Sequence, residues 1–371
     1  ELDVDFSPRG IDLTSFPYNA WRKVTRATLM DDDKEMFLTG SPQGEPGLRE
    51  AIRGYLHSAR GVNCTADQII IGAGSEYLMM LLTQILGAGR TIAMENPTYR
   101  QAYRVFESLG CQMKPVEMDA HGMNVRLLEE SGADIAYVMP SHQYPMGVVM
   151  PVKRRQELLS WAGRGEKRYL IEDDYDSEFR YRGKPVPALQ GMDIQGKVIY
   201  MGTFSKSIAP AIRVGYLVLP APLLAVYKRK CGFYASTVSR IDQKIIYQFL
   251  AEGHYERHLN RMRAIYKGKH DVLMSELKTL GTEFIVQGEY AGLHVLLKYR
   301  KAGMETWLVE EAAKARVGVY GISGFLIAPL ADQKEKCFST VVLGYARLNE
   351  DQIREGIRRL AAAWKCSRPC P

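Results

Sequence analysis

The sequence predicts an α/β protein with a large domain built on a mostly parallel sheet and a smaller C-terminal α+β domain. The 371-residue chain, with 46% hydrophobic residues, is long enough to bury a large core. From about residue 66, short apolar runs alternate with amphipathic segments of helix length. This alternation is typical of crossover connections between parallel strands that are covered on both faces. Past residue 280 the pattern becomes richer in strands.

The strands expected in the large domain are apolar runs at 68–74, 91–97, 135–141, 168–174, 197–203 and 213–220. Helices are expected at 75–86, 99–110 and 152–163, and throughout the region 221–280. Ligands of such sheets bind beyond the carboxyl ends of the strands. We therefore look for functional residues at those ends.

The C-terminal region is predicted to contain strands at 282–299 and helices at 304–315 and 349–364. Asn349 precedes the last helix and Gln352 follows three residues later, which is the pattern of a capping box. The organisation we expect is an N-terminal arm at 1–40, a large domain at 41–280 and a small domain at 281–371.

Composition argues against several classes of protein. The net charge is +7, but the basic residues are spread over short runs and form no helix-turn-helix or zinc-finger pattern, so the chain itself predicts no contact with nucleic acid. No apolar segment approaches the roughly 20 residues that a membrane span needs. Six scattered cysteines without a C-x-x-C pair, and a start unlike a signal peptide, indicate reduced thiols in a cytoplasmic protein. The missing initiator methionine suggests a fragment.

A glycine-containing turn follows the first predicted strand, with Gly72 and Gly74 before Ser75. Small residues allow backbone N–H groups at a helix N-terminus to approach a phosphate, which the helix dipole also favours. A glycine before a helix is more often only a turn, so this motif alone is weak evidence.

Five acidic residues gather at the end of another predicted strand: Glu172, Asp173, Asp174, Asp176 and Glu178. Three interpretations are open. The carboxylates could bind Mg²⁺, because hard cations prefer carboxylate oxygens. They could form a solvated loop, or one buried carboxylate could hold a proton on an aromatic nitrogen, with the Tyr175 phenol beside it.

Lys206 favours the last of these interpretations. It lies in the segment "GTFSKSIAP", between small hydroxyl residues and apolar ones, where desolvation lowers the pKa of a lysine and frees its amine for Schiff-base chemistry. A pyridoxal phosphate protein needs such a lysine, an acid for the pyridinium nitrogen and a phosphate cradle. Thr203, Ser205 and Arg213 could complete the cradle with hydroxyl and guanidinium groups. We therefore predict pyridoxal 5'-phosphate as the cofactor and expect no metal ion.

The segment "GTFSKSIAPAIRVGY" resembles the lysine motif of fold-type I pyridoxal-phosphate aminotransferases, with Thr203 in the first hydroxyl position. "ENPTYRQAYRVF" is similar to the segment whose aromatic residue, here Tyr99, stacks on the cofactor ring. "PSHQYPMG" is similar to the segment that supplies an amide to the ring hydroxyl, here Gln143.

Within "EDDYDSEF", the resemblance assigns the pyridine nitrogen to Asp173, which lies 33 residues before Lys206, and the phenolic oxygen to Tyr175. Asp174 is the fallback for Asp173. The implied catalytic residues are Lys206, Asp173 and Tyr175. The implied cofactor-binding residues are Gly74, Ser75, Glu76, Tyr99, Gln143, Asp173, Tyr175, Thr203, Ser205, Lys206 and Arg213.

A narrower resemblance is to the GabR/MocR-like bacterial transcription regulators, in which an aminotransferase-like domain follows a winged helix-turn-helix. It is carried by "DFSPRGIDLTSFPYNAWRKVTRATL", "GEPGLREAIRGYLHSARGVNCTADQIIIGAG" and "PSHQYPMGVVMPVKRRQELLSWA". It implies a homodimer that senses a small-molecule amine or amino-acid-like effector through an external aldimine. DNA would be bound only through an N-terminal domain absent from this chain. The alternative is a catalytically active aminotransferase.

Two departures from the family pattern bear on this choice. Val342 takes the place of the arginine that binds the substrate carboxylate in aminotransferases, and Thr39 takes the place of a tyrosine that reaches the neighbouring subunit's phosphate. A ligand carboxylate would then need another cation, such as Arg100, Arg104 or Arg347. The resemblance with these departures implies little or no complete transamination.

Overall fold

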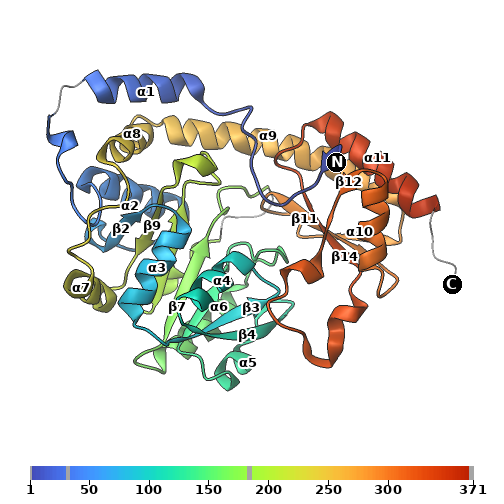
Figure 1. Ribbon diagram of the computed structural model, residues 1–371, viewed down its shortest axis with the longest axis horizontal. Coiled ribbons are helices and arrows are strands. Elements are labelled where there is room, and N and C mark those ends of the chain that lie inside the picture. The colour runs from blue at the N-terminus through green and yellow to red at the C-terminus, as the bar shows by residue number, and fades with distance from the viewer. Residues whose placement is uncertain (1, 31–33, 182–185, 367–371) are drawn as a thin grey trace.

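The computed structural model describes residues 2–30, 34–181 and 186–366, and it confirms the predicted fold class (Figure 1). Its described strands form one eight-stranded, one four-stranded and one two-stranded sheet. In Figure 1 the large sheet and its helices occupy the left and centre, and the C-terminal elements lie to the right.

The large sheet is made of β2 (Ile69–Gly72), β3 (Thr91–Asn96), β4 (Gln112–Asp119), β5 (Gly122–Met123), β6 (Ile135–Val138), β7 (Tyr169–Asp174), β8 (Val198–Thr203) and β9 (Gly215–Val218). Their spatial order is β2-β9-β8-β7-β6-β3-β4-β5. The run from β8 to β4 is parallel throughout, whereas β9 is antiparallel to both of its neighbours and β5 is antiparallel to β4.

All six strands predicted for this sheet are present, but β4 and β5 were not predicted. In β4 only Val116 is fully buried, and Lys114, Pro115 and Glu117 interrupt any apolar run. A strand near the edge of a sheet, exposed on most of its surface, lacks the continuous hydrophobic signal of the central strands.

Helices cover both faces of the large sheet (Figure 1). On one face, a core cluster is shared with α3 (Ser75–Leu86), α4 (Arg100–Ser108) and α7 (Ala221–Lys230). The opposite face packs against α5 (Val125–Glu130), α6 (Val152–Gly163), α2 (Pro46–Arg60), α8 (Arg240–Ala251) and α9 (His254–Leu277). Alternate residues of one strand, such as Ile199 and Tyr200, therefore belong to different cores.

The four-stranded sheet has the order β10-β11-β14-β13 and is antiparallel. Its strands are β10 (Phe284–Gln287), β11 (His294–Tyr299), β13 (Tyr320–Gly321) and β14 (Thr340–Gly344), and its helices are α10 (Glu305–Lys314) and α11 (Glu350–Cys366). The predicted capping box of α11 is confirmed, because the Gln352 backbone N–H donates to Asn349 Oδ1 at 2.8 Å and the Asn349 N–H donates to Gln352 Oε1 at 2.9 Å.

The N-terminal segment contacts both regions of the molecule. Strand β1 (Val4–Asp5) pairs in parallel with β12 (Val317–Gly318), whereas helix α1 (Tyr18–Met30) packs along α8. The division of the chain at residues 40 and 280 stays a prediction. Within the described ranges, no helix is both long enough and apolar enough to cross a bilayer.

Candidate functional site

The carboxyl end of β7 carries two adjacent aspartates that point to opposite faces of the sheet. Asp173 is buried, and one of its carboxylate oxygens accepts a hydrogen bond from the Tyr137 hydroxyl. Burial raises the pKa of Asp173 to about 7, because a charge is poorly solvated there, while the Tyr137 hydrogen bond acts in the other direction. An acid in this setting is well suited to pair with a cationic ring nitrogen.

Asp174 is already paired on the other face of the sheet. Its Oδ2 accepts hydrogen bonds from Arg60 Nε at 2.8 Å and from the Tyr200 hydroxyl at 2.6 Å. Burial raises the pKa of Asp174, but the Arg60 charge and these hydrogen bonds outweigh that effect and leave the pKa lowered. These contacts favour Asp173 over the fallback residue.

The other acids of the cluster each have a different partner. Glu172 accepts the backbone N–H groups of residues 189 and 190, at 2.7 and 2.8 Å. Asp176 Oδ2 lies 2.9 Å from His142 Nδ1, and Glu178 Oε1 accepts the Tyr55 hydroxyl at 3.1 Å. The magnesium and solvated-loop interpretations are therefore not supported. In the described part of the chain, no group of three potential ligands could hold a metal ion.

Lys206 lies in the loop that follows β8. Burial lowers its pKa, the Asp176 carboxylate raises it, and the Arg9 charge lowers it further. The lysine amine has no hydrogen bond or ion pair with any other residue that the structure describes. A lysine with a lowered pKa suits reaction with an aldehyde, and that role of Lys206 stays a prediction.

A glycine turn before α3 lies against Arg213. Gly74 has φ +89°, and a Cβ at this position would lie 2.4 Å from Arg213 Nη2, so only glycine leaves room for the guanidinium. Arg213 Nη2 also donates to Glu76 Oε2 at 2.6 Å. Ser75 begins α3 in the same place. The N-terminus of a helix and an arginine thus converge, which is a suitable arrangement for a phosphate.

Two hydroxyl residues lie at the end of β8, before Lys206. The Thr203 hydroxyl donates to Ser205 Oγ at 3.1 Å and accepts the Ser205 backbone N–H, also at 3.1 Å. Strand β9 brings Gly215 opposite Thr203, and Arg213 lies two residues before that strand begins. The strand pairing therefore gathers the residues that the sequence predicted for the phosphate cradle.

Three tyrosines lie in the segments that follow the carboxyl ends of β3, β6 and β7. Tyr144 makes edge-on contacts with both Tyr99 and Tyr175, each with ring centroids 6.1 Å apart. The Tyr175 hydroxyl lies 3.1 Å from His142 Nδ1. Gln143 is held differently: its amide nitrogen donates to the Pro97 carbonyl at 3.0 Å and its oxygen accepts the Met146 N–H at 2.9 Å.

The two departures from the aminotransferase pattern have clear structural counterparts. Val342 is fully buried on β14 among Leu296, Ile322 and Phe325, so it offers a ligand no polar group. Thr39 is exposed and follows the exposed residues Phe37 and Leu38.

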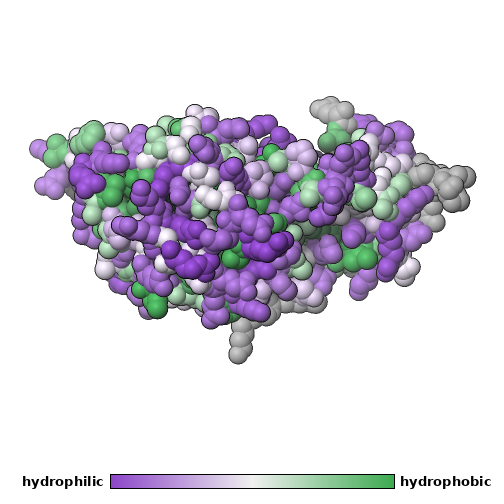
Figure 2. Space-filling view, turned by 90° about the horizontal axis from the view of Figure 1, so that it is seen from below, coloured by the Kyte–Doolittle hydropathy of each residue, from purple (hydrophilic) through white to green (hydrophobic). Residues whose placement is uncertain are grey.

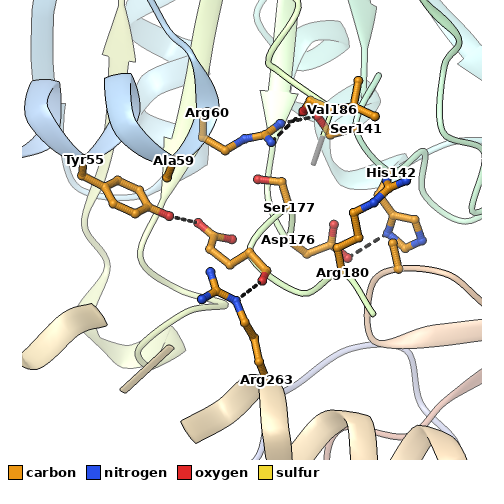
Figure 3. Close-up of a pocket in the computed structure, with 12 residues that line it drawn as sticks. Tyr55, Ala59, Arg60, Ser141, His142, Asp176, Ser177, Arg180, Val186 and Arg263 are labelled. Carbon is orange, nitrogen blue, oxygen red and sulfur yellow. Dashed lines mark hydrogen bonds and ion pairs between the residues drawn. The ribbon is translucent and has the colours of Figure 1, made fainter. Parts of the chain in front are cut away.

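A polar cavity of about 280 Å³ adjoins this site (Figure 3). His142 and Asp176 line the cavity, and both also contact the site described above or influence it. Figure 3 shows Arg60, Arg180 and Arg263 approaching the cavity from different elements. Arg60 is bound to Asp174, and Arg263 Nε donates to the Glu178 carbonyl at 2.7 Å.

Sequence reasoning left several residues of this site without a role. Tyr137 was inside a predicted strand, and nothing in an apolar run indicates which buried tyrosine faces an aspartate. Tyr144 and His142 lay inside a motif that was used only for Gln143. Arg9 lay in the quoted N-terminal segment, but only the fold brings that segment to the site.

The fold and this arrangement of lysine, aspartate and cradle define a protein of the aminotransferase class. The family described as "Aminotransferase class I and II" matches residues 12–360. An archaeal alanine:glyoxylate aminotransferase superposes with a TM-score of 0.86 at 25% identity, covering 99% of this chain and 92% of that one.

Similarity to curated proteins narrows the class. The chain is 39% identical to "Uncharacterized HTH-type transcriptional regulator YdeL" of Bacillus subtilis, over 98% of this chain and 77% of the relative. It is 30% identical to "Probable rhizopine catabolism regulatory protein MocR" of Rhizobium meliloti, over 97% of this chain and 72% of the relative. The chain belongs to the MocR/GabR family of HTH-type regulators, through their aminotransferase class I and II domain.

The family implies pyridoxal phosphate, and the residues present fit this group. A buried acid for the ring nitrogen and a lysine with a lowered pKa are both in place. Gly74 has no side chain, so the Arg213 guanidinium can lie beside the start of α3, in space that a Cβ on residue 74 would occupy.

Proposed function

We propose that this chain is the effector-sensing domain of a MocR/GabR-type regulator and that it binds pyridoxal phosphate. Lys206 would hold the aldehyde carbon, Asp173 the ring nitrogen and Tyr175 the ring hydroxyl. The phosphate would be bound by Ser75, Thr203, Ser205 and Arg213 with backbone N–H groups near Gly74. When bound, the cofactor supplies an aldehyde that accepts primary amines.

The chain's own residues prepare this exchange. Desolvation keeps a larger fraction of the Lys206 amine neutral, and Asp173 holds a proton at the ring nitrogen. Of the residues suggested for the ring hydroxyl, Tyr175 has ring contacts that place it beside Tyr144, whereas the Gln143 amide is already bonded to the backbone at both ends. We therefore assign Gln143 a supporting role in the loop.

The observation that carries the sensor function is Val342. An arginine that binds the substrate carboxylate positions the substrate, and such positioning can lower the reaction barrier by several kcal/mol. In this chain the residue at that position is apolar and buried. An amine-bearing effector would then replace Lys206 at the cofactor aldehyde without efficient turnover. A ligand that favours one of two conformations of a dimer shifts their populations.

The second candidate function is transamination, and a specific observation favours it. The chain is 28% identical to "Aromatic-amino-acid aminotransferase 1" of Thermococcus litoralis, over 95% of this chain and 85% of the relative. The lysine and the aspartate alone do not separate the two functions.

The deciding experiment mixes the cofactor-loaded protein with a panel of L-amino acids, D-amino acids, small amines and dipeptides, with 2-oxoglutarate present. Cofactor absorbance reports amine exchange, and keto-acid formation reports turnover. We expect absorbance changes with less than one keto acid formed per site. Rapid multiple turnover with an ordinary amino acid would overturn the sensor function in favour of the aminotransferase.

We also propose a homodimer that forms through the large domain together with the end of the N-terminal arm. Met30, Phe37 and Leu38 are 74%, 74% and 64% exposed, which is unusual for neighbouring large apolar residues. The face in Figure 2 is by contrast mostly hydrophilic, with apolar atoms in small separate areas. Light scattering should give a dimer for the wild-type chain and a monomer for Phe37→Glu with Leu38→Glu. A monomeric wild-type chain would contradict this assembly.

A further inference from the structure

The N-terminal segment runs across the end of β14, close to Val342. The Phe6 carbonyl accepts the Gly344 N–H at 2.8 Å. A Cβ on Gly344 would lie 2.4 Å from Pro8 Cα, so the segment lies directly on this strand. Arg9 therefore starts from a backbone position beside the strand that carries Val342.

From this position the Arg9 side chain reaches the rings of the site. Burial raises the pKa of the Tyr144 hydroxyl, and the charge of Arg9 and a hydrogen bond from its guanidinium act in the opposite direction. Tyr144 in turn contacts Tyr99 and Tyr175, the two aromatic residues expected at the cofactor. The Arg9 charge also acts on the Lys206 amine. Arg9 thus lies close enough to both the lysine and the aromatic rings to meet a ligand that is bound there.

Arg9 has free binding capacity, whereas Arg100 uses part of its own elsewhere. No acidic side chain among the described residues forms an ion pair with it, and the residue is exposed. Its Tyr144 contact uses part of a planar group that has five N–H donors. Arg100 instead donates to the Gly324 carbonyl at 3.0 Å, and the Arg347 side chain packs against Gly10.

The charges of the site select a zwitterionic ligand. An amine is needed at the cofactor aldehyde held by Lys206, and a guanidinium a short distance away favours an anion, most strongly a carboxylate in bidentate contact. A simple amine would satisfy only the first requirement. Val342 itself cannot contribute, because it is buried in an apolar cluster.

We propose that Arg9, from the N-terminal segment, binds the carboxylate of an amino-acid-like ligand, which anchors the ligand without restoring the contact that aminotransferases make from position 342. The Tyr144 hydroxyl positions the guanidinium. This inference rests on the proposed function, because it takes the ligand amine to be bound at the cofactor aldehyde. The ligand class that follows is an amino acid with a free carboxylate, rather than a simple amine.

The test compares Arg9→Gln and Arg9→Lys with wild type, and uses Arg100→Gln and Arg347→Gln as matched controls. The probes are L-alanine, D-alanine and γ-aminobutyrate, each paired with the amine that lacks its carboxylate, ethylamine or propylamine. Half-saturation is read from the absorbance of the bound cofactor. A second readout, without any amine, is the pH titration of that absorbance.

Losing a charge-assisted contact to a carboxylate should weaken amino-acid binding at least tenfold in Arg9→Gln. Binding of the matching amine should change less than twofold, and Arg9→Lys should recover part of the loss. The absorbance titration of Arg9→Gln should move to higher pH, because a positive charge near Lys206 has been removed. The two control variants should match wild type in both readouts.

Equal weakening of amino acid and amine in Arg9→Gln, or a selective loss in Arg347→Gln or Arg100→Gln instead, would overturn the role of Arg9 while leaving the proposed function intact. Wild type that binds the amines but none of the amino acids would overturn the ligand class. Wild type that shows no cofactor absorbance at all would instead contradict the proposed function.

Discussion

Asp173→Asn should stabilise the cofactor-free protein at high pH, even though it removes a residue of the cofactor site. Burial raises the pKa of Asp173 from 3.8 to about 7, so the folded protein binds this proton more tightly than the unfolded chain. Asp173 therefore lowers the free energy of unfolding. This destabilisation is absent below about pH 4, grows as the pH rises toward 7, and is constant at higher pH. Ionising this carboxyl in the folded protein therefore costs roughly 4 kcal/mol more than in the unfolded chain.

Asparagine has no charge to bury, and its oxygen can still accept the Tyr137 hydroxyl. The gain in the free energy of unfolding should therefore be larger at pH 8 than at pH 5, by roughly 2 to 3 kcal/mol. The assay is urea unfolding followed by circular dichroism, on protein from which the cofactor has been removed. In the presence of pyridoxal phosphate the same variant should retain the cofactor less well, because the ring nitrogen has lost its anionic partner.

Asp174→Asn provides the matched control, because the adjacent residue has the opposite shift. The pKa of Asp174 is lowered by Arg60 and by hydrogen bonds in spite of burial. The ionised Asp174 carboxylate therefore stabilises the fold at pH values above the pKa that this group has in the unfolded chain. Breaking its buried pair with Arg60 should lower the free energy of unfolding by roughly 3 to 5 kcal/mol at neutral pH. Equal destabilisation by the two variants at pH 8, or a pH-independent effect of Asp173→Asn, would refute the assignment of Asp173.

Two further predictions concern the cofactor site. Lys206→Ala should remove the yellow absorbance of the bound cofactor without unfolding the protein, and a borohydride-reducible linkage in this variant would show that another amine is used. Arg213→Ala should raise the cofactor dissociation constant at least tenfold, on the order of 1.4 kcal/mol, whereas Glu76→Gln should leave it equal or lower, because it removes the carboxylate that competes for Arg213. Fluorescence titration measures both constants, and an unchanged constant in Arg213→Ala would remove that residue from the phosphate cradle.

The central strands and their ends could be predicted from sequence because burial on both faces leaves continuous apolar runs. The same pattern placed Asp173 and Asp174 at the end of one strand but could not show which of them faces the cofactor site. Only the alternation of β7 shows that Asp174 faces Arg60, which comes from the distant helix α2. Strand β4 was missed because most of its residues are exposed.

Contacts across long sequence separations explain the remaining omissions. Tyr144 lies within a recognisable motif, but its contact with Arg9 depends on how the N-terminal segment crosses β14. A lone arginine near a glycine in an unstructured stretch is indistinguishable from a surface residue. Val342 shows in the sequence that the usual carboxylate-binding arginine is missing, whereas the proposed role of Arg9 depends on contacts that only the fold reveals.

The position of Arg9 also suggests how ligand binding could reach the rest of the molecule. Its segment is joined to the C-terminal region through β1 and β12, whereas Lys206 belongs to the large sheet. A ligand held by both residues would link the two regions, and it would favour whichever conformation brings them together.

This linkage predicts slower amide hydrogen exchange in residues 4–12 when L-alanine or another binding amino acid is added to the cofactor-loaded protein. Residues 3, 4 and 6 already donate backbone hydrogen bonds to residues 316 and 318, and a ligand anchored at Arg9 would oppose their opening. The paired amine without a carboxylate should leave this exchange unchanged, as should the amino acid with Arg9→Gln. Equal protection by amine and amino acid would mean that the cofactor end of the ligand alone orders the segment, and that Arg9 does not carry the signal.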